Sequence, residues 1–397
     1  MTNNEQDNLR QSIEALQDFW SNHENYDIRE KAREYIELYQ SNGNSDHFSW
    51  VHPEDASYIK ENGCNAVRWG IPNQILGDID KAKFIFGLFN PGTQMRTGIG
   101  NECKDITEYV EEEKKEERNL GVDGVNFESK EYSENLNFYL EHVISVENVM
   151  AQELKKLYKI FKEDREVLLN RNKNGKLSKN SYNGAVVKKI AYYLFAYYSK
   201  AFMDNGLKSN GFQNSMRYYY NLFEKIEKVK GIVKEKSLNY NVEQEFNHAV
   251  EKIAICNIEM IPYRSNGAKD IVNAYRKKLV DLPSTSKIAS LITEKIIRDT
   301  DTIAVFRAFR PKGKNGWRYI LERNAEEQEV NFKENIKPSL FHFSNSSAAL
   351  SKKNIKTYDS LAENPQEKVD KAVDALLEEL KMQPFVDEIN NIIEENS

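Results

Sequence analysis

Polar side chains that could bind or activate a ligand lie at the ends of four apolar, strand-like runs. The runs cover residues 83–89, 252–258, 301–307 and 338–343, and the polar residues in or after them include Asn90, Asn257, Arg307, Arg310, His342 and Asn345. The carboxyl ends of parallel strands meet at one edge of a sheet, where open α/β sheets bind their ligands. One shared pocket there could hold amides that orient water, guanidiniums that bind phosphate, and an imidazole that donates a hydrogen bond.

The first run is the clearest of the four. It ends abruptly in Asn90-Pro91-Gly92, and an apolar run bounded by turn residues predicts a buried strand. Pro91 fixes one backbone angle, and Gly92 allows the chain to reverse. Asn90 is therefore expected at the carboxyl end of a central strand, although Asn-Pro-Gly by itself is also typical of an ordinary turn.

Helical patterns surround these strands. Apolar residues recur at helical spacing before residue 65, between about 103 and 250, over 285–298 and after 366. Strands that alternate with helices indicate a parallel sheet with right-handed crossovers. We expect a three-layer α/β/α fold with a short central parallel sheet of about four strands. The expected divisions are a helical N-terminal extension (1–65), an α/β domain (66–360) with a helical insertion (about 103–250), and C-terminal helices (361–397).

Composition limits the partners. The 397-residue chain has a formal net charge of −6, so it is no generic basic nucleic-acid coat, and an anionic partner must meet a local patch. Residues 307–318 supply five basic and no acidic side chains, which indicates a phosphate-binding loop or a solvated turn. Three scattered cysteines and six scattered histidines predict no metal site and no cofactor. No apolar run reaches the roughly 20 residues of a membrane span, and the polar start of the chain favours a cytoplasmic protein.

Together these motifs resemble the uracil-DNA glycosylase superfamily. The segment 87–92, Gly-Leu-Phe-Asn-Pro-Gly, is similar to that family's first motif, Gly-x-Asn-Pro-Gly, with one extra residue. Asn257, Pro262 and Arg264 follow the order of a second family element. The segment 342–351 is similar to the closing motif but lacks its proline, so either His342 or Asn345 is the equivalent residue. Iron–sulfur branches of the family need four cysteines, so no cluster is expected.

The resemblance implies a role for each of these residues. Asn90 would position the attacking water, and His342 or Asn345 would stabilise the departing base. Asn257 would read the base edge, and Phe89 or Tyr263 would stack on the ring beside Pro91 and Gly92. The DNA-binding residues would be Arg264, Arg307, Arg310, Lys312, Lys314, Ser344, Ser346 and Ser347.

The function implied by the resemblance is a DNA glycosylase, a hydrolase of N-glycosyl bonds that flips out a base and leaves an abasic site. The large insertion favours a modified base, as in phage DNA, and a role in antiviral defence. One alternative is a non-catalytic module that binds nucleic acid or protein on the same fold, and another is a small-molecule hydrolase. Asn257 could also be a turn residue and His342 a core histidine. The tyrosines of residues 192–198 are expected to pack in a helix, and some could face the pocket.

Overall fold

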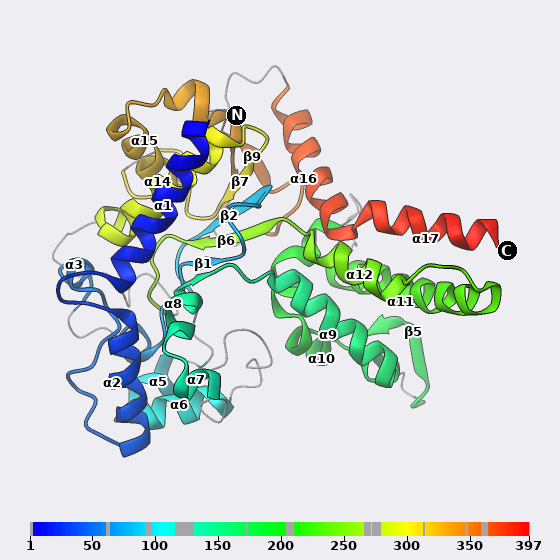
Figure 1. Cartoon of the computed structure of the whole chain (residues 1–397), viewed down its shortest axis with the longest axis horizontal. Coiled ribbons are helices and arrows are strands. Elements are labelled where there is room, and N and C mark those ends of the chain that lie inside the picture. The colour runs from blue at the N-terminus through cyan, green and yellow to red at the C-terminus, as the bar shows by residue number, and fades with distance from the viewer. Residues whose placement is uncertain are drawn as a thin grey trace.

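The computed structural model describes residues 3–60, 64–92, 95, 97–115, 130–171, 174–203, 210–265, 271, 279–312, 314–345, 348–358 and 364–396. A sheet crosses the middle of the molecule between groups of helices (Figure 1). The α-helices are α1 (Asn3–Ser21), α2 (Ile28–Ser41), α3 (Pro53–Ala56), α4 (Asn65–Trp69), α5 (Thr97–Glu102), α6 (Ile106–Lys115), α7 (Lys130–Glu134), α8 (Asn137–Val143), α9 (Val149–Asp164), α10 (Gly184–Ile190), α11 (Gly211–Lys236), α12 (Val242–Glu251), α14 (Pro283–Arg298), α15 (Trp317–Glu327), α16 (Pro365–Lys381) and α17 (Gln383–Glu395). None of the helices in the described ranges is both long and apolar enough to cross a bilayer.

The strands form one large sheet and one hairpin. They are β1 (Ile75–Leu76), β2 (Phe84–Leu88), β3 (Ile144–Ser145), β4 (Leu169–Arg171), β5 (Leu177–Tyr182), β6 (Ile255–Glu259), β7 (Ile303–Phe306), β8 (Leu340–Phe343) and β9 (Ile355–Thr357). The large sheet has the order β3-β1-β6-β2-β7-β8-β9, and β4 pairs with β5 apart from it. The mixed α/β class is thereby confirmed.

The four strands expected from the sequence form the middle of the large sheet. β6, β2, β7 and β8 run parallel to one another, and Phe86 in β2 lies opposite Asn257 in β6 and Val305 in β7. The expectation of about four strands was too small, because β1 and β9 pair antiparallel with β6 and β8, and β3 pairs with β1. β1 and β3 have two residues each, which is too short to produce a hydrophobic alternation in the sequence.

Alternate residues of the central strands enter two different apolar clusters. In β2, Ile85 packs in a cluster with residues of α1, α14 and α15, whereas Phe84 and Phe86 pack in another with residues of α9, α11, α12 and α16. Successive side chains of a strand point to opposite faces, so both faces of the sheet bury apolar residues. This explains why β2 is a continuous apolar run rather than an alternating one.

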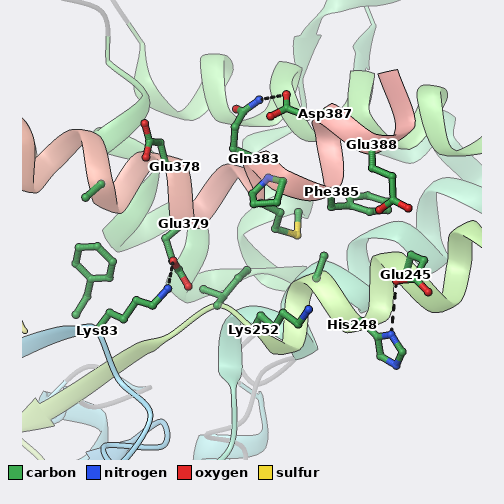
Figure 2. A pocket seen from close by; sticks show the side chains of 16 residues that line it. Lys83, Glu245, His248, Lys252, Glu378, Glu379, Gln383, Phe385, Asp387 and Glu388 are labelled. Atoms are coloured by element: carbon green, nitrogen blue, oxygen red, sulfur yellow. Dashed lines mark hydrogen bonds and ion pairs between the residues drawn. The ribbon is translucent and has the colours of Figure 1, made fainter. Parts of the chain in front are cut away.

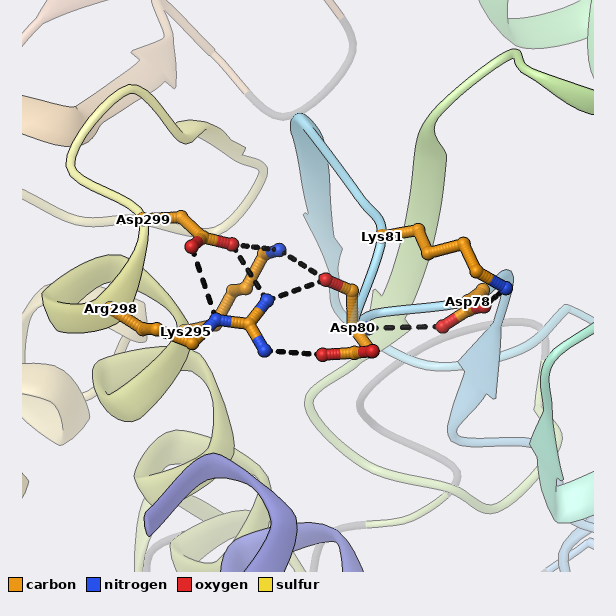
Figure 3. A network of polar contacts seen from close by, with 6 residues as sticks. All are labelled: Asp78, Asp80, Lys81, Lys295, Arg298 and Asp299. Carbon is orange, nitrogen blue, oxygen red and sulfur yellow. Dashed lines mark hydrogen bonds and ion pairs between the residues drawn. The ribbon is translucent and has the colours of Figure 1, made fainter. Parts of the chain in front are cut away.

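The turn before β2 is fixed to the end of α14 by a network of charged groups (Figure 3). Arg298 contacts both Asp80 and Asp299, and Lys295 Nζ lies 2.5 Å from an Asp299 oxygen and 2.7 Å from the backbone oxygen of Asp80. The Lys295 side chain is only 2% exposed, so solvent screens its contacts little. The network fixes the start of β2 and therefore, one strand length away, the position of Asn90.

A buried polar cluster connects the N-terminal region to the loop after β6. The hydroxyl of Tyr263 donates a hydrogen bond to Asp55 (2.7 Å) and accepts one from the backbone N–H of His52 (3.0 Å), while the backbone N–H of Ser284 donates to Asp55 (3.2 Å). The His52 ring stacks on Phe19 with 3.8 Å between centroids. Burial raises the pKa of Asp55 from 3.8 to about 6, and burial lowers the pKa of His52 from 6.5 to about 4. Folding therefore favours the protonated, neutral form of Asp55 and the deprotonated, neutral form of His52.

The opposite pKa shifts of Asp55 and His52 predict how the free energy of unfolding depends on pH, and Asp55→Asn separates the two contributions. The stabilisation from protonated Asp55 is complete below pH 3.8 and is lost as the pH rises through about 6, whereas that from neutral His52 is complete above pH 6.5 and is lost as the pH falls through about 4. Between pH 4 and 6.5 the two contributions offset each other. Asp55→Asn removes the first, so acidification from pH 7 to 4 should cost the variant about 3 kcal/mol more free energy of unfolding than wild type.

Urea denaturation at several pH values measures this difference. Asp301→Asn, on an exposed residue, is the control and should follow the wild-type pH dependence. If the curves of Asp55→Asn and wild type run parallel from pH 7 to 4, Asp55 does not bind its proton more tightly in the folded state.

Candidate active site at the strand ends

The candidate site lies where the strand order of the sheet changes direction. From β2 the chain continues to β6 on one side, and from β7 it continues to β8 on the other, while β2 and β7 are neighbours. In open α/β sheets such a switch point leaves a crevice at the carboxyl ends of the two strands. Asn90 follows β2 and Arg307 follows β7, so both residues lie at the carboxyl edge of the parallel strands, as the sequence predicted.

Asn90 has a fixed amide nitrogen. Nδ2 donates to the backbone oxygens of Pro91 (2.8 Å), Ser265 (3.1 Å) and Tyr263 (3.5 Å), and to the Ser265 hydroxyl (3.1 Å). The side-chain oxygen Oδ1 accepts no hydrogen bond from the described residues. Because the residue is only half-buried, this oxygen can accept a hydrogen bond from a ligand or a water.

The loop after β2 is joined to the loop after β6. Ser265 N–H donates to the Pro91 oxygen (3.1 Å), and Arg264 Nη1 donates to the Gly92 oxygen (3.3 Å). Pro91 is buried and Gly92 is exposed. Gly92 does not adopt a left-handed backbone, and a Cβ atom there would meet nothing within 4 Å, so the chain reverses without needing glycine at this position.

Asn257 lies inside the protein beside a tyrosine of the insertion. Its side chain is 5% exposed, its Oδ1 accepts a hydrogen bond from the Tyr198 hydroxyl (2.5 Å), and its Nδ2 has no partner among the described residues. Tyr198 ends the π-helix Leu194–Tyr198 that follows α10, in the segment where the sequence predicts that tyrosines pack in a helix. The expectation that a tyrosine of this cluster could face the pocket therefore agrees with the position of Tyr198.

A small cavity adjoins Asn257. Its volume is about 10 Å³, and its lining includes Phe86, Leu88, Arg307 and Phe343. That volume accommodates about one water molecule and is too small for a nucleobase. The Arg307 guanidinium lies 4.1 Å from the Phe343 ring centroid and donates to the Ala348 oxygen (3.2 Å), and burial lowers its pKa. The cavity thus combines a buried amide donor, a cation and aromatic walls.

His342 lies on the opposite face of the sheet from Asn257. Its ring stacks on Phe309 with 5.1 Å between centroids and 5° between planes, and Phe309 belongs to the cluster with α14 and α15. Nδ1 lies 3.0 Å from the Phe343 oxygen, and burial lowers the pKa of the imidazole. Asn345 is instead exposed beyond the end of β8. His342 is therefore turned away from the face of the sheet that carries Asn257, whereas Asn345 lies at the carboxyl end of β8.

Three further predicted residues are held by protein contacts. Tyr263 is fully buried on Asp55, and Phe89 packs against the cluster with α14. Arg264 is 4% exposed, and its Nε donates to the Ile71 oxygen (2.7 Å). In this conformation the Tyr263 ring offers no exposed face to a ligand, and the Arg264 side chain is buried.

The basic loop after β7 does lie at the surface. Arg310, Lys312 and Lys314 are exposed, and Ala308 and Arg310 have left-handed backbones with φ of 49° and 51°. Gly316 permits this loop to close, because a Cβ atom there would lie 2.4 Å from the Ala308 oxygen. Ser344 is exposed at the end of β8 beside this edge, whereas Ser346 and Ser347 lie outside the described residues.

Sequence reasoning missed Glu259. It ends β6 opposite Leu88, is 9% exposed, and follows Asn257 by two residues, so its side chain leaves the same face of the sheet. That spacing was a usable signal, because a second polar residue at period two within a buried strand is unusual.

The described residues contain no group of three or more His, Cys, Asp or Glu side chains that could hold a metal ion. Comparisons of the chain with protein-family models, with curated proteins and with solved structures found no match.

Proposed function

We propose that the chain is a DNA glycosylase that hydrolyses the N-glycosyl bond of a flipped-out base. The observation that carries the proposal is Asn90 at the sheet's switch point, whose amide nitrogen is held by the Pro91 and Ser265 oxygens while its own oxygen accepts no hydrogen bond from the described residues. An open amide oxygen in a fixed orientation is suited to position a water molecule. The burial of β2 side chains in two clusters supports the three-layer arrangement expected for this fold.

In the proposed reaction the water attacks the anomeric carbon of the sugar. The carbon–nitrogen bond breaks, the electron pair leaves with the base, and the water's proton is lost to solvent or to the base. The sugar becomes cation-like, and the carboxylate of Glu259, which leaves the same face of the sheet as Asn257, would stabilise it electrostatically. Asn345 and the Asn257 amide nitrogen would donate to the departing base. A modified base of phage DNA as the substrate, and a role in antiviral defence, belong to this proposal through the family resemblance.

The direct test is incubation of the purified protein with uracil-containing, mismatched and phage-modified DNA, followed by detection of abasic sites. The proposal expects release from at least one of these DNAs. Absence of release from all of them by a folded protein, as judged by circular dichroism, would contradict it. Release from free nucleosides but not from DNA would indicate a small-molecule hydrolase instead.

The exposed basic loop should supply much of the DNA affinity. Replacing Arg310, Lys312 and Lys314 by alanine should weaken binding at low salt and reduce the slope of log K against log salt by about 2 to 3, because fewer counterions are released. Stability should change little, since the side chains are exposed. Fluorescence anisotropy with a labelled duplex at several salt concentrations measures both quantities.

The matched control removes three exposed lysines of α11, Lys228, Lys234 and Lys236. It changes the net charge equally but lies outside the strand-end edge, so it should keep the wild-type slope. Equal losses in the two variants would show that net charge alone governs binding and would remove the loop from the proposed interface.

A second candidate function is a binding module without catalysis. The cavity beside Asn257 favours it, because Tyr198 leaves room for about one water molecule and not for a base. DNA affinity that survives Asn90→Ala, with no abasic product from any substrate, would support the module. Base release would require Tyr198 to move when DNA binds.

A further inference from the structure

A large cavity lies at the end of the sheet opposite Asn90. It is a groove of about 690 Å³ between α12, the junction of α16 with α17, and the residues that precede β2 and β6 (Figure 2). Lys83 and Ile253 line it, and they stand before the amino ends of β2 and β6. A partner in this groove would therefore leave the candidate active site open.

The groove has an apolar floor and acidic walls. Phe84, Ile253, Met382 and Phe385 contribute apolar surface. Five carboxylates line the walls against two lysines, and the acidic residues are Glu245 on α12 together with Glu378, Glu379, Asp387 and Glu388 on α16 and α17. A ligand that fits must combine an apolar body with positive charges on two sides. DNA and anionic membranes are excluded as occupants, because the walls would repel them.

The walls of the groove are held in place by the protein itself. The hydroxyls of Tyr218 and Tyr219 in α11 donate to the backbone oxygens of Lys381 (2.6 Å) and Leu380 (2.8 Å) at the end of α16. Glu379 accepts a hydrogen bond from the Ala254 N–H (2.9 Å), which fixes α16 to the start of β6. A groove formed before binding costs a ligand less ordering free energy.

Three of the wall carboxylates serve no ion pair within the described part of the chain. Glu378, Asp387 and Glu388 are exposed and make no salt bridge there, although Gln383 Nε2 donates a hydrogen bond to Asp387 (2.7 Å). Glu379 contacts Lys83 (3.5 Å) and Glu245 contacts His248 (3.7 Å). Charges on opposite sides of an apolar floor fit a peptide segment better than a small cation, which would leave the floor uncovered.

We infer that this groove binds a basic peptide segment of a partner protein, in which an apolar side chain is flanked by lysines or arginines. The apolar residue would cover Met382 and Phe385, and the flanking cations would approach Glu378 and Glu388. The inference does not depend on the glycosylase proposal, because the groove and the strand-end site lie at opposite ends of the sheet.

The test uses the full chain and a fluorescein-labelled peptide with a central Phe-Leu pair between lysine triplets. Anisotropy should show saturable binding that weakens with salt, and a peptide with glutamates in place of the lysines should not bind. Glu378→Lys/Glu388→Lys should weaken binding of the basic peptide at least tenfold. The control Glu24→Lys/Glu326→Lys has the same charge change on exposed residues elsewhere and should bind as wild type does.

Three outcomes would overturn the inference. Equal loss in the control variant would mean that the peptide follows net charge, and equal binding of the glutamate peptide would mean that the walls do not select it. Concentration-dependent dimerisation in light scattering, abolished by Glu378→Lys/Glu388→Lys, would assign the groove to a second copy of this chain instead.

Discussion

Replacing Asn90 by alanine is expected to reduce base release about a hundred- to a thousand-fold while the protein remains folded. The substitution removes the oxygen that would position the attacking water, and loss of a positioned catalytic group costs rates of this order. It also removes the hydrogen bonds from Nδ2 to the Pro91 and Ser265 oxygens, which should lower the free energy of unfolding by about 1 kcal/mol. Single-turnover release from the best substrate, together with a urea melt, separates the two effects.

Asn148 offers a matched control for this experiment. Its Nδ2 also donates to backbone oxygens, those of Val250 (3.2 Å), Glu251 (3.1 Å) and Ile253 (3.0 Å), but its Oδ1 accepts a hydrogen bond from Ala151 as the N-cap of α9. Asn148→Ala should therefore cost as much stability or more, about 1–2 kcal/mol, and leave release unchanged. If Asn148→Ala and Asn90→Ala slow release equally, the effect of Asn90 is structural and the proposed mechanism fails.

The strands that place Asn90 could be predicted because each is a short, mostly apolar run with a turn at its end. β2, β7 and β8 lie within the predicted ranges and β6 extends one residue beyond its range, to Glu259, since burial on both faces requires such runs. The short strands β1 and β3 could not be predicted, because two residues carry no periodicity. Their position depends on the pairing of β1 with β6 and of β3 with β1, which is a property of the folded sheet.

The sequence did not predict to which face of the sheet a polar side chain points. Asn257 and His342 follow similar strand patterns, yet Asn257 contacts Tyr198 and His342 stacks on Phe309 across the sheet. Period two fixes which neighbours share a face within one strand, but it does not relate one strand to the next until the register is known. Tyr198 lies 59 residues before Asn257 in the sequence, and no local pattern relates the two.

Tyr263 and Arg264 show the same limit for long side chains. Their positions after a strand suggested ligand binding, but the contacts that bury them come from Asp55 and Ile71 far earlier in the chain. A buried arginine that donates to backbone oxygens is a structural element, whereas an exposed arginine such as Arg310 remains available to phosphate. Substituting each arginine in turn therefore tests whether the buried arginine stabilises the fold and the exposed arginine contributes to DNA binding.

Arg264→Leu is expected to destabilise the protein by about 3 kcal/mol or more without changing its intrinsic affinity for DNA. The substitution leaves the buried Ile71 oxygen without its donor Nε and removes the Nη1 hydrogen bond to Gly92, and an unsatisfied buried acceptor is costly. A urea melt should show the lost stability. DNA titrations performed well below the new midpoint should give the wild-type affinity and salt slope, because a 4% exposed side chain cannot release counterions from phosphate.

Arg310→Leu provides the opposite pattern on an exposed residue of the same type. Its free energy of unfolding should stay within about 0.5 kcal/mol of wild type, while its DNA salt slope should fall by about 1. If Arg264→Leu instead kept full stability and lost DNA affinity, the guanidinium would have to leave the Ile71 and Gly92 oxygens when DNA binds. The two loops after β2 and β6 would then separate on binding, and Asn90, which is held between them by Ser265, would change its orientation in the complex.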